Sequence, residues 1–221
     1  MIATKCYDIT FHNREAITTS SRFYRWKNVR YDEPRDVFDG AMMDNSINQL
    51  IDSLIKKTNN IAEVHFSSAM RPPAEAVIQL DFPRLNIVIE GQLRDLALGE
   101  NAAPLQARDV LYIAGDGWNW PQWQTPCLLL SILFGKQQLE FTLQRWNGEA
   151  LTLVQKIQVP RRGPRVGSFL LQALNEIRMQ PQEQQTARCI VISLLSHCTD
   201  LLGSQAQTSS RSQALFDEVC A

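Results

Sequence analysis

The segment from Leu80 to Leu143 constrains the fold more than any other part of the chain. It is a series of short apolar runs, and turn residues, chiefly Pro and Gly, interrupt these runs at close intervals. Short runs with no helical pattern between them are typical of antiparallel sheets, because parallel neighbours need a long crossover that is usually a helix. We therefore expect an antiparallel sandwich or barrel in the middle of the chain.

The same spacing continues on both sides of this segment and predicts eight strands, a number that suits a jelly roll or a related double-sheet fold. Asn147 and Gly148 lie between two alternating runs, which is a strong signal for a β-hairpin. A turn is predicted at Glu90 and Gly91. The predicted strands are Ala62–Ser68, Ala76–Leu80, Leu85–Glu90, Leu93–Ala97, Val110–Ala114, Cys127–Phe134, Gln138–Trp146 and Leu151–Val159.

Helical periodicity flanks the predicted strands, and the fold class is therefore α+β. Apolar residues at helical spacing predict helices over about 45–57, 168–179 and 182–202, with Gly203 ending the last of these. A further helical pattern opens at Ser209 and is incomplete at Ala221. We expect three parts: an N-terminal segment with one helix over 1–61, a β domain over 62–160, and a helical dimerisation or linker region over 161–221.

Composition and charge exclude several classes of protein. The net charge of −1 over 221 residues gives no general attraction to nucleic acid or to an anionic membrane. No apolar run approaches the roughly 20 residues of a membrane helix, and the N-terminus lacks the apolar core of a secretory signal. We expect a cytoplasmic protein without a membrane partner.

The five cysteines are scattered and form no CxxC pair, so neither a zinc site nor a disulfide framework is expected. Cys127, Cys189 and Cys198 lie among apolar residues and are predicted to fill small spaces in the core. Cys6 and Cys220 complete the set.

Motifs for catalysis and cofactor binding are missing from the sequence. It contains no GxSxG, no P-loop, no GxGxxG and no HxH pair of the kind that metal-binding cupins use. We expect no enzymatic activity, no catalytic residue, no metal and no cofactor.

Three tryptophans, Trp118, Trp120 and Trp123, gather in the sequence GDGWNWPQW after a predicted strand. A tryptophan offers a large apolar face and one N–H donor, which suits the mouth of a site for an organic ligand. A hydrophobic plug over the end of the sandwich explains the cluster equally well, and a contact surface for a partner is a third interpretation.

Two further patterns leave alternatives open. Basic and aromatic residues alternate over 13–31, which favours an edge strand with basic outward residues over a site for single-stranded nucleic acid. The apolar stripe of the helix over 182–202 suits packing on the β domain, on the helix over 168–179, or on a second copy of the chain.

Three stretches together resemble the N-terminal regulatory half of AraC-type transcription regulators. They are FPRLNIVIEG at Phe82–Gly91, LQARDVLYIAGDGWNWP at Leu105–Pro121, and SSRSQALFDEVCA at Ser209–Ala221. The second is similar to a segment that begins with Gly-Asp in that family, here with Arg108 and Asp109 in its place. The third is similar to the linker helix that leads into two helix-turn-helix units.

The resemblance implies a cupin-like β fold that binds an unknown small-molecule effector and forms a homodimer. DNA would be bound only through a C-terminal helix-turn-helix half that is absent from this chain. On this basis the ligand-binding residues are predicted to be Trp118, Trp120, His65 and Arg84. The predicted dimer contacts are Ile190, Leu194, Leu195 and Cys198.

The chain departs from the usual family pattern in two ways, because Trp120 stands near the place of a common histidine and the helix-turn-helix half is absent. The alternative interpretation is a stand-alone cupin-like binding protein or enzyme, and a third is a constitutive dimerisation module without a ligand. The effector, the target genes and the sign of regulation do not follow from the sequence.

Overall fold

The computed structural model describes residues 47–56, 60–67, 78–79, 81–115, 117–161, 166–180 and 183–219, and side chains up to Ser204. The helices are α1 (Ile47–Ile55), α2 (Val166–Ile177), α3 (Gln184–Val219) and the short 3-10 helix η1 (Leu96–Leu98). The strands are β1 (Val64–Phe66), β2 (Ile78–Gln79), β3 (Arg84–Asp95), β4 (Leu105–Gln106), β5 (Val110–Ile113), β6 (Trp118–Asn119), β7 (Pro121–Gln122), β8 (Cys127–Phe134), β9 (Gln138–Trp146) and β10 (Leu151–Pro160).

The main sheet is open and mostly antiparallel, with strand order β1-β5-β3-β8-β9-β10. The strands β4 and β7 pair with the far half of β3, and β2 pairs with β6 in a separate small sheet. One pair departs from the expected antiparallel arrangement, because β1 runs parallel to β5. The α+β class is confirmed, whereas the jelly-roll type of the prediction does not follow from this strand order.

Strand β3 corrects the predicted turn at Glu90 and Gly91. The strand continues through both residues, and its register with β8 shifts between Val88 and Glu90. Gly91 has a φ of 76°, and a Cβ atom there would lie 2.1 Å from the carbonyl oxygen of Pro126. One long strand therefore runs through a bulge at Ile89 and on through Gly91, where the sequence suggested a reversal between two short strands.

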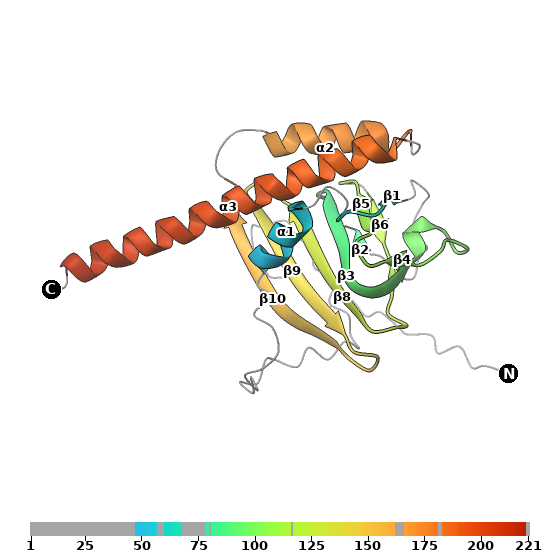
Figure 1. The fold of residues 1–221 in the computed structure, drawn as a ribbon, viewed down its shortest axis with the longest axis horizontal. Coiled ribbons are helices and arrows are strands. Elements are labelled where there is room, and N and C mark those ends of the chain that lie inside the picture. Colours follow the sequence, from blue (N-terminus) through green and yellow to red (C-terminus); the bar gives the residue numbers. More distant parts are fainter. Residues whose placement is uncertain are drawn as a thin grey trace, which may run out of the picture.

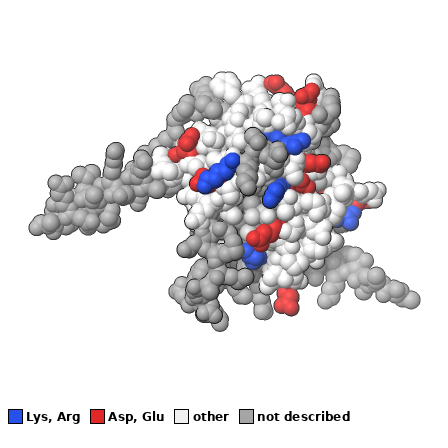
Figure 2. Space-filling model, in the orientation of Figure 1, with Lys and Arg blue, Asp and Glu red and all other residues white. Residues whose placement is uncertain are grey.

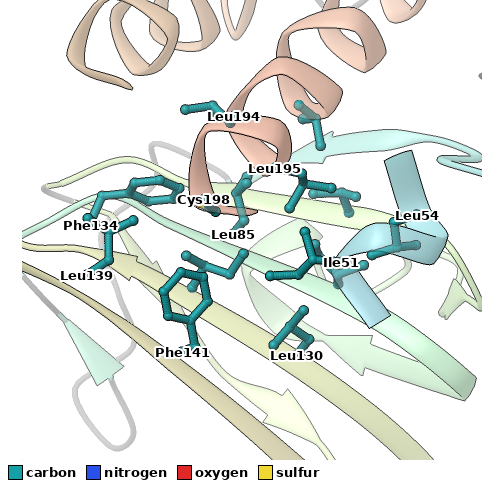
Figure 3. Packing of buried hydrophobic residues seen from close by; sticks show 14 of the residues in the cluster. Ile51, Leu54, Leu85, Leu130, Phe134, Leu139, Phe141, Leu194, Leu195 and Cys198 are labelled. Carbon is teal, nitrogen blue, oxygen red and sulfur yellow. The ribbon is translucent and has the colours of Figure 1, made fainter. Parts of the chain in front are cut away.

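Three helices cover one face of the main sheet, with α2 and α3 across one side and α1 beside α3 (Figure 1). Figure 3 shows Leu194 and Leu195 of α3 above Leu85, Leu130 and Phe141 of the sheet. All five of these side chains are at most 1% exposed. The apolar stripes of all three helices thus share one core with the sheet.

The hydroxyl group of Tyr112 on β5 anchors α2 to this core. It donates a hydrogen bond to Oδ1 of Asn175, over a distance of 2.9 Å. Tyr112 itself is fully buried, and its ring meets that of Phe66 edge-on. The position of α2 is thereby specified by a polar contact within an otherwise apolar layer.

Helix α3 is much longer than the predicted helix over 182–202. It continues through Gly203 to Val219, a total of 36 residues, and its second half extends beyond the sheet (Figure 1). Glycine weakens a helix interior by about 1 kcal/mol but does not end it without a reversal of the chain. The hydroxyl of Ser204, the residue after this glycine, donates a hydrogen bond to the carbonyl oxygen of Leu201 within the helix.

Several other predictions are confirmed. The bounds of β8 and β9 agree with the predicted strands, and Asn147 and Gly148 connect β9 and β10 as an antiparallel hairpin. Cys127 and Cys198 are buried in the core, but Cys189 lies exposed on α3, off the stripe that faces the sheet. The expectations for residues 1–41, for Cys6 and for Cys220 lie outside the described residues.

Candidate ligand-binding face

The register of the main sheet places one residue from each of its six strands in a row on each face. The row on the helix-covered face, called the apolar row, consists of Phe66, Tyr112, Leu85, Ile132, Phe141 and Ile157. The row beside it on the opposite face, called the polar row, consists of His65, Leu111, Asn86, Ser131, Thr142 and Lys156. Successive residues of a strand point to opposite faces, so a shift by one residue changes the layer from apolar to polar.

Hydrogen bonds order the centre of the polar row. The hydroxyl of Ser131 on β8 donates to Oδ1 of Asn86 on β3, at 2.8 Å. Asn86 is 2% exposed, and Thr142 next to Ser131 is partly buried. The orientation of the Asn86 amide is therefore fixed by this bond and by burial.

An ion pair lies at the β10 end of the polar row. Nζ of Lys156 is 3.0 Å from Oε1 of Glu140, and Nε2 of Gln158 donates to the other carboxylate oxygen at 2.7 Å. The Glu140 side chain is 11% exposed, whereas that of Lys156 is 38% exposed. This end of the row therefore presents both charges at the border between protein and solvent.

His65 lies at the other end of the polar row, on the edge strand β1. Its Nε2 atom is 3.6 Å from Oε2 of Glu63 and 3.6 Å from Oδ2 of Asp109. Asp109 also accepts hydrogen bonds from the backbone N–H groups of Glu63 and Gln106. The imidazole nitrogen therefore lies near two carboxylates, although it makes no hydrogen bond to either.

Arg84 lies on the same face of the sheet as the polar row, two residues before Asn86 on β3, and is 6% exposed. Burial lowers the pKa of its guanidinium to about 10, and the charge of Asp95 opposes this shift. The group therefore stays charged at neutral pH. A buried cation and a buried carboxylate lie close enough here to influence each other.

Asp95 organises the tryptophan segment next to Arg84. Its Oδ1 atom accepts hydrogen bonds from the N–H groups of Ala97 and Trp120, each at 2.9 Å, and its Oδ2 atom accepts one from Nδ2 of Asn119 at 3.2 Å. Desolvation by burial raises the pKa of this carboxyl, although these donors and Arg84 act in the opposite direction. One side chain thereby caps η1 and holds the backbone at Trp120.

The tryptophans differ in exposure. Trp118 is 5% exposed, Trp120 is partly exposed, and Trp123 packs against the apolar cluster around Leu93 and Leu111 on this side of the sheet. Trp118 also pairs with Gln79 in the small sheet. Asp95 links the backbone of this segment to the surroundings of Arg84, whereas His65 lies on the other side of β5 from Arg84.

The predicted dimer contacts lie in or beside the core that α3 shares with the sheet. Leu194, Leu195 and Cys198 are fully buried against the sheet and α1, and Ile190 is partly buried at the edge of the same cluster. Burial raises the pKa of the Cys198 thiol to about 12. These side chains pack within one chain, against the sheet and α1.

Sequence reasoning missed the residues that order the second face of the sheet. Asp95 precedes a short Leu-Ala-Leu-Gly turn, which is a recognisable helix-capping signal. Asn86, Ser131 and Thr142 are single residues on three different strands, and they meet only through the register of those strands. A single sequence does not contain that register.

A half-open cavity of about 430 Å³ lies elsewhere, between α1 and the bulge of β3. None of the four predicted ligand-binding residues lines it. Its lining consists of Ser53, Leu54, Lys56, Asn60, Val88, Ile89 and Arg108.

Two further observations concern the described part of the chain. No three His, Cys, Asp or Glu side chains gather there in an arrangement that could hold a metal ion. None of the helices there is both long and apolar enough to cross a membrane.

Comparison with known proteins supports a relationship to transcription regulators. The chain is 52% identical over 177 residues to a protein of Escherichia coli (strain K12) named "Uncharacterized HTH-type transcriptional regulator YijO", a match that covers 80% of this chain and 62% of YijO. It is 26% identical over 175 residues to the "Uncharacterized HTH-type transcriptional regulator YpdC" of the same organism, covering 77% of this chain and 60% of YpdC. No protein-family profile and no solved structure matches the chain.

The matches therefore span about three fifths of the length of each relative. Both relatives are named as helix-turn-helix transcription regulators, and the chain is similar to them over most of its own length.

Proposed function

We propose that this chain is the effector-sensing and dimerising part of an AraC-type transcription regulator, and that it controls a helix-turn-helix DNA-binding region outside residues 1–221. The observation that carries the proposal is the 52% identity to YijO across 80% of the chain. The fold is in keeping with it, because helices cover one face of the sheet, whereas the opposite face carries the polar row beside a second apolar cluster.

The distribution of charge supports a sensing role over direct contact with DNA. Lys and Arg together number 22 and Asp and Glu together 23 in the sequence. Among the described residues, basic and acidic side chains are interspersed on the face drawn in Figure 2, and neither sign forms a continuous patch there. Binding to the DNA backbone relies on clustered cations that replace counterions, so we assign this contact to the region outside the chain.

In this proposal a small polar effector contacts the polar row and favours one arrangement of the sheet and helices. The recognition groups are His65 on β1 and Arg84 on β3, which lie on one face toward the β1 end of the sheet. A coupling free energy of about 1–3 kcal/mol between effector and helix arrangement changes occupancy roughly 5- to 150-fold. The chain acts as a cytoplasmic binding module and not as an enzyme.

The first test joins residues 1–221 to an unrelated DNA-binding module that occupies its operator only as a dimer. We expect the fusion to repress a reporter in bacterial cells more strongly than the module alone. Sedimentation of the 221-residue chain should give twice the mass of one chain. Repression equal to that of the module alone, together with a single-chain mass, would contradict the proposed dimer.

The second test is a thermal-shift screen of the chain against polar metabolites. A ligand that binds the native state stabilises it by RT ln(1 + [L]/Kd), which is about 2.7 kcal/mol at one hundred times Kd. The shift should decrease in His65→Ala but persist in Lys136→Ala, which changes an exposed lysine in the β8–β9 turn. If no metabolite moves the melting temperature while the dimer persists, a constitutive dimerisation module replaces the sensor.

A further inference from the structure

The edge strand β1 is fixed on its two sides by different parts of the molecule. On one side it pairs with β5, where Val110 donates to the carbonyl oxygen of Glu63 at 2.9 Å and Ser67 donates to that of Tyr112 at 3.0 Å. On the other side lies the backbone of Val64, which the β5 pairing leaves open. An open strand edge presents unpaired donors and acceptors that need partners.

The side chain of Gln184 supplies both partners to Val64. Its Oε1 atom accepts from the Val64 N–H at 3.0 Å, and its Nε2 atom donates to the Val64 carbonyl oxygen at 2.9 Å. The primary amide therefore takes the place that a peptide group of a further strand would take. Gln184 is the first residue of α3 and lies 120 positions from Val64 in the sequence.

We propose that Gln184 is a positioning residue that couples strand β1, and through it the polar row, to helix α3. The inference deepens the proposed function and rests on it only for the identity of what occupies the polar row. Val64 precedes His65 in a strand of three residues, so a displacement of the His65 side chain moves the two groups that Gln184 holds. The signal then passes to α3 through two hydrogen bonds.

A chemically similar contact ties α1 to the far edge of the sheet but does not reach α3. Oε1 of Gln155 on β10 accepts from the backbone N–H of Ile47, the first residue of α1, at 2.9 Å. This contact offers a single bond at a helix start, where the N–H groups have no partner within the helix. Gln155→Leu is accordingly a control for loss of one glutamine contact without loss of the β1–α3 connection.

The first measurement is amide hydrogen exchange of the whole 221-residue chain, followed by NMR. In Gln184→Leu we expect about tenfold faster exchange at Val64 and in the first turn of α3. The neighbouring variant Gln185→Leu, which changes an exposed side chain, should leave both unchanged. Gln184→Glu keeps the acceptor for the Val64 N–H but loses the donor, and it should fall between the other two.

The second measurement is a double-mutant cycle with His65→Ala, which separates coupling from simple structural support. In the presence of Gln184, His65→Ala should speed exchange in the first turn of α3 by about threefold. In the Gln184→Leu background it should add nothing there, whereas in the Gln155→Leu background its effect should persist. Additive effects of His65→Ala and Gln184→Leu would overturn the proposal, and so would unchanged exchange at α3 in Gln184→Leu.

The outcomes also separate this inference from the proposed function. A non-additive cycle in a chain that binds no metabolite would support the connection between β1 and α3 and contradict the sensor. An additive cycle in a chain that binds a metabolite would support the sensor and remove Gln184 from its path.

Discussion

The apolar row and the polar row cross the same six strands, one residue apart, and yet they have different roles. Phe141 of the apolar row is fully buried beneath the helices, whereas Thr142 of the polar row is partly buried on the opposite face. Contacts in the apolar row are numerous and non-directional, and contacts in the polar row are few and directional. The contribution to stability is therefore expected to be concentrated in the apolar row.

We therefore expect the stability of the protein to respond differently to substitutions on the two faces. A core position loses transfer free energy and gains a cavity when a side chain is shortened, and the surrounding residues fill that cavity only in part. A polar position loses one hydrogen bond with a small net value, unless a buried partner is left without any bond. The following predictions test the contrast from the largest effect to the smallest.

The largest effect is expected for Phe141→Ala. The substitution should lower the free energy of unfolding by about 4 kcal/mol, because it leaves a cavity beneath α3. Thr142→Ala, one residue later on the other face, should lower it by less than about 1 kcal/mol. Urea unfolding of both variants measures the difference, and equal losses would show that the two faces contribute alike.

The next largest loss in the free energy of unfolding is expected for Asp95→Ala. It leaves the N–H groups of Ala97 and Trp120 without their acceptor, and we expect a loss of about 3 kcal/mol. Asp95→Asn should lose much less, because Oδ1 of Asn119 has no hydrogen-bond partner among the described residues and can accept from the new amide. Similar losses in both variants would show that the charge of Asp95 matters more than its geometry.

Asp95 also gives a prediction for pH. Its pKa is raised in the folded protein, so the folded state holds this proton more tightly than the unfolded state. The contribution of Asp95 to stability is fully present below the unfolded pKa and is lost as the pH rises through the folded pKa. As the pH rises from acid to neutral, the free energy of unfolding of Asp95→Asn, measured with urea, should increase relative to that of the parent chain. A decrease relative to the parent over the same range would contradict a raised pKa for Asp95 in the folded state.

Ser131→Ala, in the centre of the polar row, should cost about 1 kcal/mol. The variant removes the donor to Oδ1 of Asn86, a side chain that is 2% exposed. Ile132→Ala, its neighbour beneath the helices, provides the matched comparison and should cost about 3 kcal/mol. Thermal unfolding of the pair tests whether the contrast at 141 and 142 holds on the adjacent strand.

The smallest effect is expected for Lys156→Ala. Its ion pair with Glu140 is partly open to solvent, and such pairs contribute between about 0 and 1 kcal/mol. The loss should shrink further in high salt because screening weakens the pair. A loss above about 2 kcal/mol in urea unfolding would indicate that the polar row carries stability after all.

The elements of the fold were largely predictable from the sequence, because apolar periodicity and turn residues are local signals. The alternating residues of β9 and the Asn147-Gly148 pair specified the hairpin with β10, and the stripe that includes Leu194 specified a helix. Gly91 was misleading, because a glycine signals both a turn and a bulge, and the distinction depends on the distant carbonyl of Pro126. Gly203 was misleading because a glycine after an apolar stripe commonly ends a helix, whereas α3 continues through it to Val219.

The candidate site was predictable only in part. His65 was placed in a predicted strand and Arg84 directly before another, and both lie on one face of the sheet. The polar residues that share this face on β8, β9 and β10 come together through the register, which no local pattern encodes. The stripe of α3 was assigned to a dimer because a helix of known periodicity shows which residues are covered but not what covers them.

The length of α3 has a mechanical consequence. At 1.5 Å per residue its 36 residues measure about 54 Å, and the end that carries Gln184 is the one held by the sheet. The side chains of this helix are buried against the sheet as far as Leu202, so about 17 residues, or roughly 26 Å, extend beyond the core. Tilting the helix by about five degrees where it leaves the core carries Val219 through roughly 2 Å, so a small change at the sheet is enlarged with distance along the helix.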